Sequence, residues 1–217
     1  PDVVVEELHY GAVAVAQRLE ELGVRALVLI GAAMRGRTPG AVQRRRIRPI
    51  ALPVEQVQQA VRDAVTGYVT IDLLIDVATG LGALPGRTVS IEVEPDRTDP
   101  AAELSPSAAA GLEEALQLVR TELDRIPLLE LADELRPLVD TDRLDPAPAV
   151  DTVRKLLHEL DLLDEHGRWG ASFALRDRLR RHIADGYTGH GMEHLDWGLW
   201  WALIEELDRQ QARDASR

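Results

Sequence analysis

Residues 25–30 read RALVLI, an apolar run of leucine, valine and isoleucine that follows one arginine. A short continuous run of this kind indicates a strand that is buried on both faces of a sheet. Just before it, residues 12–22 carry apolar side chains at helical spacing, and Gly23 is a typical helix end. A helix that leads directly into a doubly buried strand is typical of α/β proteins.

The same alternation of strand-like and helix-like segments continues through the first half of the chain. Further strands are predicted at residues 2–8, 41–48 and 88–93, and further helices at 54–66, 71–84 and 105–123. The first of these strands is predicted from the β-branched run Val3 to Val5. We therefore expect residues 1–125 to form an α/β domain with a mainly parallel sheet flanked by helices. Strands 3–8 and 25–30 should be parallel, because a helix connects them.

After Pro127 the strand patterns disappear and helical patterns replace them. Helices are predicted at residues 128–139, 151–163, 172–184 and 195–211. Residues 140–148, with two prolines, are predicted to be a linker. Residues 128–217 should therefore form a separate, all-α region.

The composition restricts the partners and the compartment. The chain has 37 acidic against 25 basic residues, so nucleic acid is not an expected partner. It contains no cysteine, which favours a reducing compartment such as the cytoplasm. It has neither an apolar run of about 20 residues nor a basic start, so we expect neither membrane insertion nor secretion. The basic cluster Arg44, Arg45, Arg46 and Arg48 is interpreted as a charged strand edge.

Four local motifs of the first half occur in the order and spacing of one protein family. They are LVLI at 27–30 before a loop of small residues, TPGAV at 38–42, IEVEP at 91–95 and LSP at 104–106. Together they resemble the hydrogenase maturation endopeptidases, which remove a C-terminal peptide from the large subunit of nickel-iron hydrogenases. The resemblance covers residues 1–125 and implies a phosphorylase/hydrolase-like α/β fold.

The resemblance also implies where that family's three metal ligands would stand, and this chain lacks them. The family opens with a strand, a Gly-x-Gly-Asn turn and an acidic ligand, whereas this chain begins at what would be the second strand. Gly31 stands where the family has an aspartate, and Thr70 or Ile71 where it has a histidine. The adjacent Asp72 is one carboxylate without partner ligands, so we interpret it as a helix N-terminal acid that interacts with the helix dipole.

Three functions are compatible with these patterns. The resemblance implies that the family's ligands recognise nickel already loaded into the hydrogenase. Loss of these ligands in this chain favours a degenerate, non-catalytic homologue. Such a homologue could still dock a hydrogenase large subunit with the loop from Gly31 to Gly40, at the edge of the sheet where α/β folds bind ligands. The second function is an active endopeptidase whose opening strand is missing here. The third is an adaptor or structural subunit that uses the helical half.

Two patterns of the second half were also considered as sites. HGMEH at 190–194 matches the inverted zinc-protease motif His-x-x-Glu-His, but its glycines favour a turn rather than the helix that the motif needs. Trp197, Trp200 and Trp201 could pack in a core or form a surface for a protein partner or for self-association. No serine lies in a nucleophile motif such as Gly-x-Ser-x-Gly. We therefore predict no catalytic residue, metal or cofactor.

Overall fold

The computed structural model divides the chain into two compact units, unit 1 at residues 1–121 and unit 2 at residues 122–217. Each unit has buried apolar residues of its own. The structure describes residues 3–8, 10–64, 70–99, 102–139, 148–169, 174, 176–178, 180–181 and 197–216.

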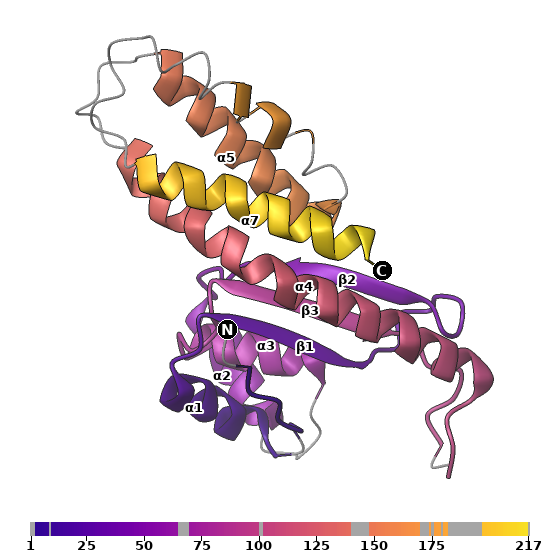
Figure 1. The fold of residues 1–217 in the computed structure, drawn as a ribbon. Coiled ribbons are helices and arrows are strands. Elements are labelled where there is room, and N and C mark those ends of the chain that lie inside the picture. The colour runs from indigo at the N-terminus through magenta and orange to yellow at the C-terminus, as the bar shows by residue number, and fades with distance from the viewer. Residues whose placement is uncertain are drawn as a thin grey trace. The chain divides into compact units, whose positions relative to one another are not determined.

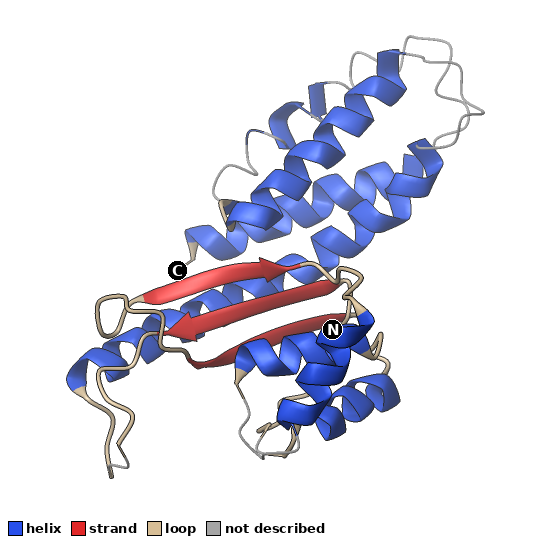
Figure 2. Ribbon diagram, turned by 180° about the vertical axis from the view of Figure 1, so that it is seen from behind, coloured by secondary structure: helices blue, strands red, loops and turns tan. Residues whose placement is uncertain are grey.

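Unit 1 contains a three-stranded mixed sheet (Figure 2). The strands are β1 (Ala26–Ala32), β2 (Val42–Ile47) and β3 (Arg87–Val93), in the order β1-β3-β2. β1 runs parallel to β3, and β2 runs antiparallel to it at the other edge. The sheet confirms the predicted α/β class and these three strands, but it has one parallel and one antiparallel pairing instead of a mainly parallel arrangement.

Helices cover both faces of this sheet (Figure 1). One face packs against α1 (Ala12–Leu22), α2 (Val54–Ala64) and α3 (Ile71–Gly80), and its core includes Leu29, Val15, Leu74 and Val77. The opposite face, which carries Val89 and Ile91, packs against the first part of α4 (Pro106–Val139). The alternation of side chains along β3 therefore sends its valines and isoleucine to α4, and Thr88, Ser90 and Glu92 to the three shorter helices.

Local signals in the sequence account for the ends of α1 and α3. α1 ends where predicted, because Gly23 adopts a left-handed conformation with φ of 57° and donates its N–H to the carbonyl of Leu19. α3 begins where predicted, after Thr70, whose side-chain oxygen accepts the N–H of Leu73 at 3.1 Å. These caps hold the first turn of α3, with Asp72, against the sheet.

The predicted strand at residues 2–8 was wrong for the part that the structure describes. Residues 3–8 form no strand, and Val3, Val4 and Val5 are at least half exposed. A β-branched run becomes a strand only when another strand pairs with it. Among the described residues, β3 is the strand that pairs with β1, so the expected parallel pair of 3–8 with 25–30 does not form. Glu6 instead pairs with Arg18 of α1.

The predicted break between a helix at 105–123 and another at 128–139 was also wrong, although the described regular structure after residue 127 is helical, as expected. α4 continues through Pro127 to Val139, and the boundary between the units falls inside this helix. A proline in a helix interior costs about 3 kcal/mol, because it has no N–H to donate and its ring crowds the preceding turn. Burial of Leu128, Ala132 and Leu135 on the same helix offsets this cost.

The described regular structure of unit 2 is helical. It comprises the second part of α4, α5 (Pro148–His166) and α7 (Trp197–Ala215), and these helices bury Leu160, Ile204 and Leu207. The predicted linker at 140–148 lies outside the described residues except for its last one, and the predicted helix at 172–184 is described only in part. None of the described helices is long and apolar enough to span a bilayer.

Candidate functional site

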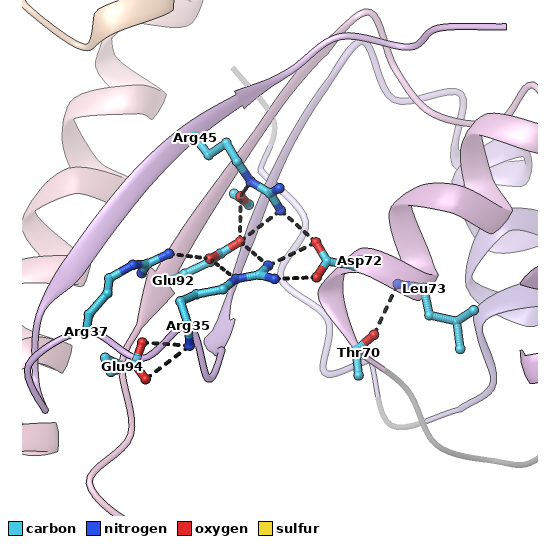
Figure 3. Close-up of polar contacts among 9 residues, drawn as sticks. Arg35, Arg37, Arg45, Thr70, Asp72, Leu73, Glu92 and Glu94 are labelled. Atoms are coloured by element: carbon cyan, nitrogen blue, oxygen red, sulfur yellow. Dashed lines mark hydrogen bonds and ion pairs between the residues drawn. The ribbon is translucent and has the colours of Figure 1, made fainter. Parts of the chain in front are cut away.

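Asp72, one of the two predicted site residues of unit 1, belongs to a cluster of arginines and acids (Figure 3). Gly31, the other, lies on β1 opposite Glu92 of that cluster. Five side chains form what we call the arginine–carboxylate cluster: Arg35, Arg37, Arg45, Asp72 and Glu92. The two acids come from β3 and from the first turn of α3, and the arginines from β2 and the loop after β1. The cluster therefore depends on the sheet order, which places β3 between β1 and β2.

Glu92 is the centre of the cluster. Its residue is 1% exposed, and its carboxylate accepts hydrogen bonds from Arg35 at 3.0 Å, Arg37 at 3.1 Å and Arg45 at 2.9 Å. Burial raises the pKa of this carboxyl group, but the bonds from Arg35 and Arg37 and the charge of Arg45 outweigh that effect. The pKa of Glu92 is therefore lower than its ordinary value, and the group is held as a carboxylate.

Asp72, at the start of α3, pairs with two of these three arginines, Arg35 and Arg45. It accepts hydrogen bonds from Arg35 at 2.6 and 2.9 Å and from Arg45 at 2.9 Å. These bonds, those from Arg35 above all, lower the pKa of Asp72 to about 2 against the opposing effect of burial. Asp72 is thus a helix N-terminal acid, as predicted from the sequence, and in addition an ion-pair partner of two arginines.

The loop that follows β1 is fixed by a further buried acid, Glu94. Its carboxylate accepts the backbone N–H groups of Arg35 at 2.9 Å and Gly36 at 3.1 Å. Gly36 has φ of 74° and Gly40 has φ of 81°, conformations that glycine adopts without strain. Gly40 also donates its N–H to the carbonyl of Glu94 at 2.8 Å. The loop that holds Arg35 and Arg37 is therefore tied to β3 at both of its ends.

Gly31 lies on β1 directly opposite Glu92. A Cβ atom added to Gly31 would lie 3.1 Å from Cδ1 of Ile71, the residue that precedes Asp72. Positions 31 and 71 are thus neighbours in space, although they are far apart in the sequence. A larger side chain at position 31 would have to displace Ile71.

The chemistry open to this arrangement is limited, because arginines already occupy both carboxylates. Each carboxylate oxygen of Asp72 and Glu92 accepts at least one guanidinium N–H. Within the part of the chain that the structure describes, no group of three or more His, Cys, Asp or Glu residues could hold a metal ion. The cluster is suited to holding a loop and a helix end in place.

The predicted site residues of unit 2 are described only in part. Trp201 is 49% exposed on α7, whereas its neighbours Leu203 and Leu207 are buried. The side chains of Trp197 and Trp200 lie outside the description, as does the whole of the HGMEH motif at 190–194.

Sequence reasoning did not find the acids that organise the site. Glu92 and Glu94 alternate with Ile91 and Val93 at the end of β3, and this pattern usually indicates a strand with one solvated face. The glutamates are buried all the same, and their carboxylates bond to the arginines of the cluster and to the backbone of the loop after β1. Arg45 was interpreted with its neighbours as part of a charged strand edge. β2 is indeed an edge strand, but the Arg45 side chain bonds to Asp72 and Glu92.

The resemblance to the hydrogenase maturation endopeptidases therefore depends on the four sequence motifs and on the order in which they occur. The chain has no match among protein-family models, curated proteins or solved structures.

Proposed function

We propose that this chain is a non-catalytic homologue of the hydrogenase maturation endopeptidases that acts in hydrogenase maturation or assembly by binding protein. One observation carries the proposal: the resemblance aligns Gly31 with one metal ligand and Thr70 or Ile71 with another, and a Cβ atom built on Gly31 would lie 3.1 Å from Cδ1 of Ile71. Two ligands of a single ion must lie this close. The alignment was made from sequence motifs alone, so the proximity of positions 31 and 71 supports it independently.

The proposed loss of metal chemistry rests on the side chains at these positions. Gly31 and Ile71 offer no side-chain donor atom to a cation, and the Thr70 hydroxyl caps α3 by accepting the N–H of Leu73. Arg35 and Arg45 place two positive charges on Asp72 and Glu92, the nearest carboxylates. A divalent cation would have to displace bound guanidinium groups and approach their charge, which is unfavourable at distances of a few ångströms. Recognition of nickel in a substrate would fail for the same reasons.

The loop after β1 is the surface that we propose for the hydrogenase large subunit. It follows the carboxyl end of β1, and the carboxyl end of a parallel strand is where open α/β sheets bind ligands. Glu94 holds its backbone in place, and Met34, near its start, is 71% exposed. A fixed loop with an exposed, adaptable apolar side chain suits protein binding, because little conformational freedom is lost on association.

A binding and cleavage assay with a hydrogenase large-subunit precursor tests this function. We expect the chain to bind the precursor and to leave its C-terminal extension intact, as read by mass spectrometry. Met34→Ala should weaken binding by about 1–2 kcal/mol, whereas Val54→Ala, at an equally exposed position on α2, should not. Removal of the extension by the purified chain would instead identify an active endopeptidase. Absence of binding would exclude the proposed partner.

The exposure of Trp201 favours a second function, in which the helical unit acts as an adaptor. A tryptophan that is 49% exposed on a helix is a typical anchor for a protein partner. Trp201→Ala should weaken self-association or partner binding by about 1–3 kcal/mol and leave the melting temperature nearly unchanged. Loss of thermal stability without loss of association would return Trp201 to a structural role.

A further inference from the structure

Arg125 is a buried cation inside unit 2. It lies on α4, its side chain is 3% exposed, and two of its three nitrogens have acceptors on α7. Nη1 donates to Gln210 at 2.7 Å, and Nη2 donates to the two carboxylate oxygens of Asp214 at 2.7 and 2.9 Å. The third nitrogen, Nε, is also buried, but among the residues that the structure describes it has no acceptor.

A second buried donor lies beside the first. Trp169, which follows α5, is 3% exposed, and its ring centre lies 5.8 Å from Cζ of Arg125. Its indole Nε1–H is buried and has no hydrogen-bond partner in the described part of the chain. Burial of an N–H group without an acceptor destabilises a fold, so such groups are almost always satisfied. Two neighbouring donors of this kind therefore indicate an acceptor that the described side chains do not supply.

The charges around these donors show which kind of acceptor fits. Ion pairs connect six charged side chains of α4 and α7, namely Asp124, Arg125, Glu206, Arg209, Arg213 and Asp214. Gln210 joins the pairs into one network, because it accepts a hydrogen bond from Arg125 and donates one to Glu206. Three arginines thus balance three acids, and an added anion would be repelled by the carboxylates that the arginines already hold. A neutral acceptor is favoured.

We propose that unit 2 has an internal water site, in which bound water accepts the N–H groups of Arg125 Nε and Trp169 Nε1. Water is the neutral ligand that suits the site, because one molecule accepts hydrogen bonds from N–H groups and returns others to carboxylate or carbonyl oxygens. Internal water typically makes about three such bonds to buried polar groups. The site would join α4, α7 and the segment after α5 around one buried cation. This inference does not depend on the proposed function.

Magnetization transfer from water to these two protons tests the site in the wild-type chain. We expect water cross-peaks from the indole N–H of Trp169 and from the Nε–H of Arg125, with opposite signs in NOESY and ROESY spectra, as for long-lived bound water. Trp169→Phe removes the indole N–H and identifies its signal among the four tryptophans. Trp201, which is 49% exposed, is the matched control, because surface water exchanges too fast to give opposite signs.

Two results would overturn the proposal. Absence of either cross-peak, or equal signs in the two spectra, would mean that no long-lived water contacts these N–H groups. A saturable shift of the Trp169 indole signal on titration with sodium chloride or sodium phosphate would identify an anion as the acceptor, whereas we expect no larger shift than for Trp201. If Trp169→Phe does not fold, triple-resonance assignment of the wild-type chain identifies the Trp169 signal instead.

Discussion

Glu92 is the residue on which the balance of charge inside unit 1 depends. It lies on the central strand and receives hydrogen bonds from three arginines of two other segments. Such an acid joins the loop after β1, the edge strand β2 and, through Arg35, the start of α3. The intact cluster contributes modestly to the stability of the fold. Removal of the acid costs more than that, because it leaves partly buried guanidinium groups without a counter-charge.

Glu92→Gln should lower the free energy of unfolding of unit 1 by about 3 kcal/mol. The amide keeps the shape of the side chain but removes the charge that holds Arg35, Arg37 and Arg45. Urea denaturation followed by far-UV circular dichroism measures the change, and Glu55→Gln on the exposed surface of α2 is the control, with an expected change below about 0.5 kcal/mol. Equal effects of the two substitutions would mean that the cluster is not a structural centre.

Asp72 predicts how stability depends on pH. Its pKa is about 2 in the folded chain and near 3.8 when unperturbed, so it favours folding above about pH 4, and this contribution disappears as the pH falls through about 2. The carboxylate is 47% exposed, so water screens it and the contribution is less than about 1 kcal/mol. Glu92 and Glu94, whose pKa values are also lowered, act with the same sign.

Asp72→Asn should therefore lose less stability than the wild-type chain between about pH 5 and pH 2.5. Denaturant midpoints at the two pH values, measured for both proteins, provide the comparison. An identical loss in the two proteins would show that Asp72 does not differ in pKa between the folded and unfolded chains.

At the scale of the elements, sequence patterns predicted those elements that carry helix caps, apolar runs or a periodic spacing of apolar residues. α1, α3, β1 and β3 were found in this way, because these signals are visible in the sequence. Strand pairing is not visible there, so residues 3–8 were assigned a strand that the structure lacks. The cluster was missed for the same reason, since its acids and arginines meet through pairings between distant segments.

α4 gives a prediction at this scale. Pro127→Ala should stabilise the helix by about 1 kcal/mol, because alanine supplies the N–H that can bond to the carbonyl of Leu123 and relieves crowding of the preceding turn. The expected gain is less than the full cost of a proline, since Pro127 is partly buried and alanine fills less space. Thermal melts of the two proteins decide the sign, and a lower melting temperature in the variant would show that the proline ring is needed for packing.

The whole molecule consists of two units with separate cores, and its tryptophans report on only one of them. All four, Trp169, Trp197, Trp200 and Trp201, belong to unit 2. Inside that unit Arg125 lies 5.8 Å from the ring centre of Trp169 and pairs with Asp214 at 2.7 Å. Tryptophan fluorescence therefore follows unit 2, whereas circular dichroism follows the helices of both units.

Glu92→Gln should separate these two signals. We expect the variant to shift the unfolding transition seen by circular dichroism toward lower urea and to leave the fluorescence transition in place, because the substitution lies in unit 1. A parallel shift of both signals would mean that the two units unfold as one cooperative body.

The proposed function requires that this chain does not recognise nickel, because Arg35 and Arg45 occupy the carboxylates beside the positions that the resemblance aligns with metal ligands. Calorimetric titration of the wild-type chain with nickel, at neutral pH and in parallel with zinc, tests it most directly. We predict no stoichiometric binding with micromolar or tighter affinity, because Gly31 and Ile71 offer no ligand and Arg35 and Arg45 hold Asp72 and Glu92. Stoichiometric nickel binding that Asp72→Asn abolishes would contradict the claim.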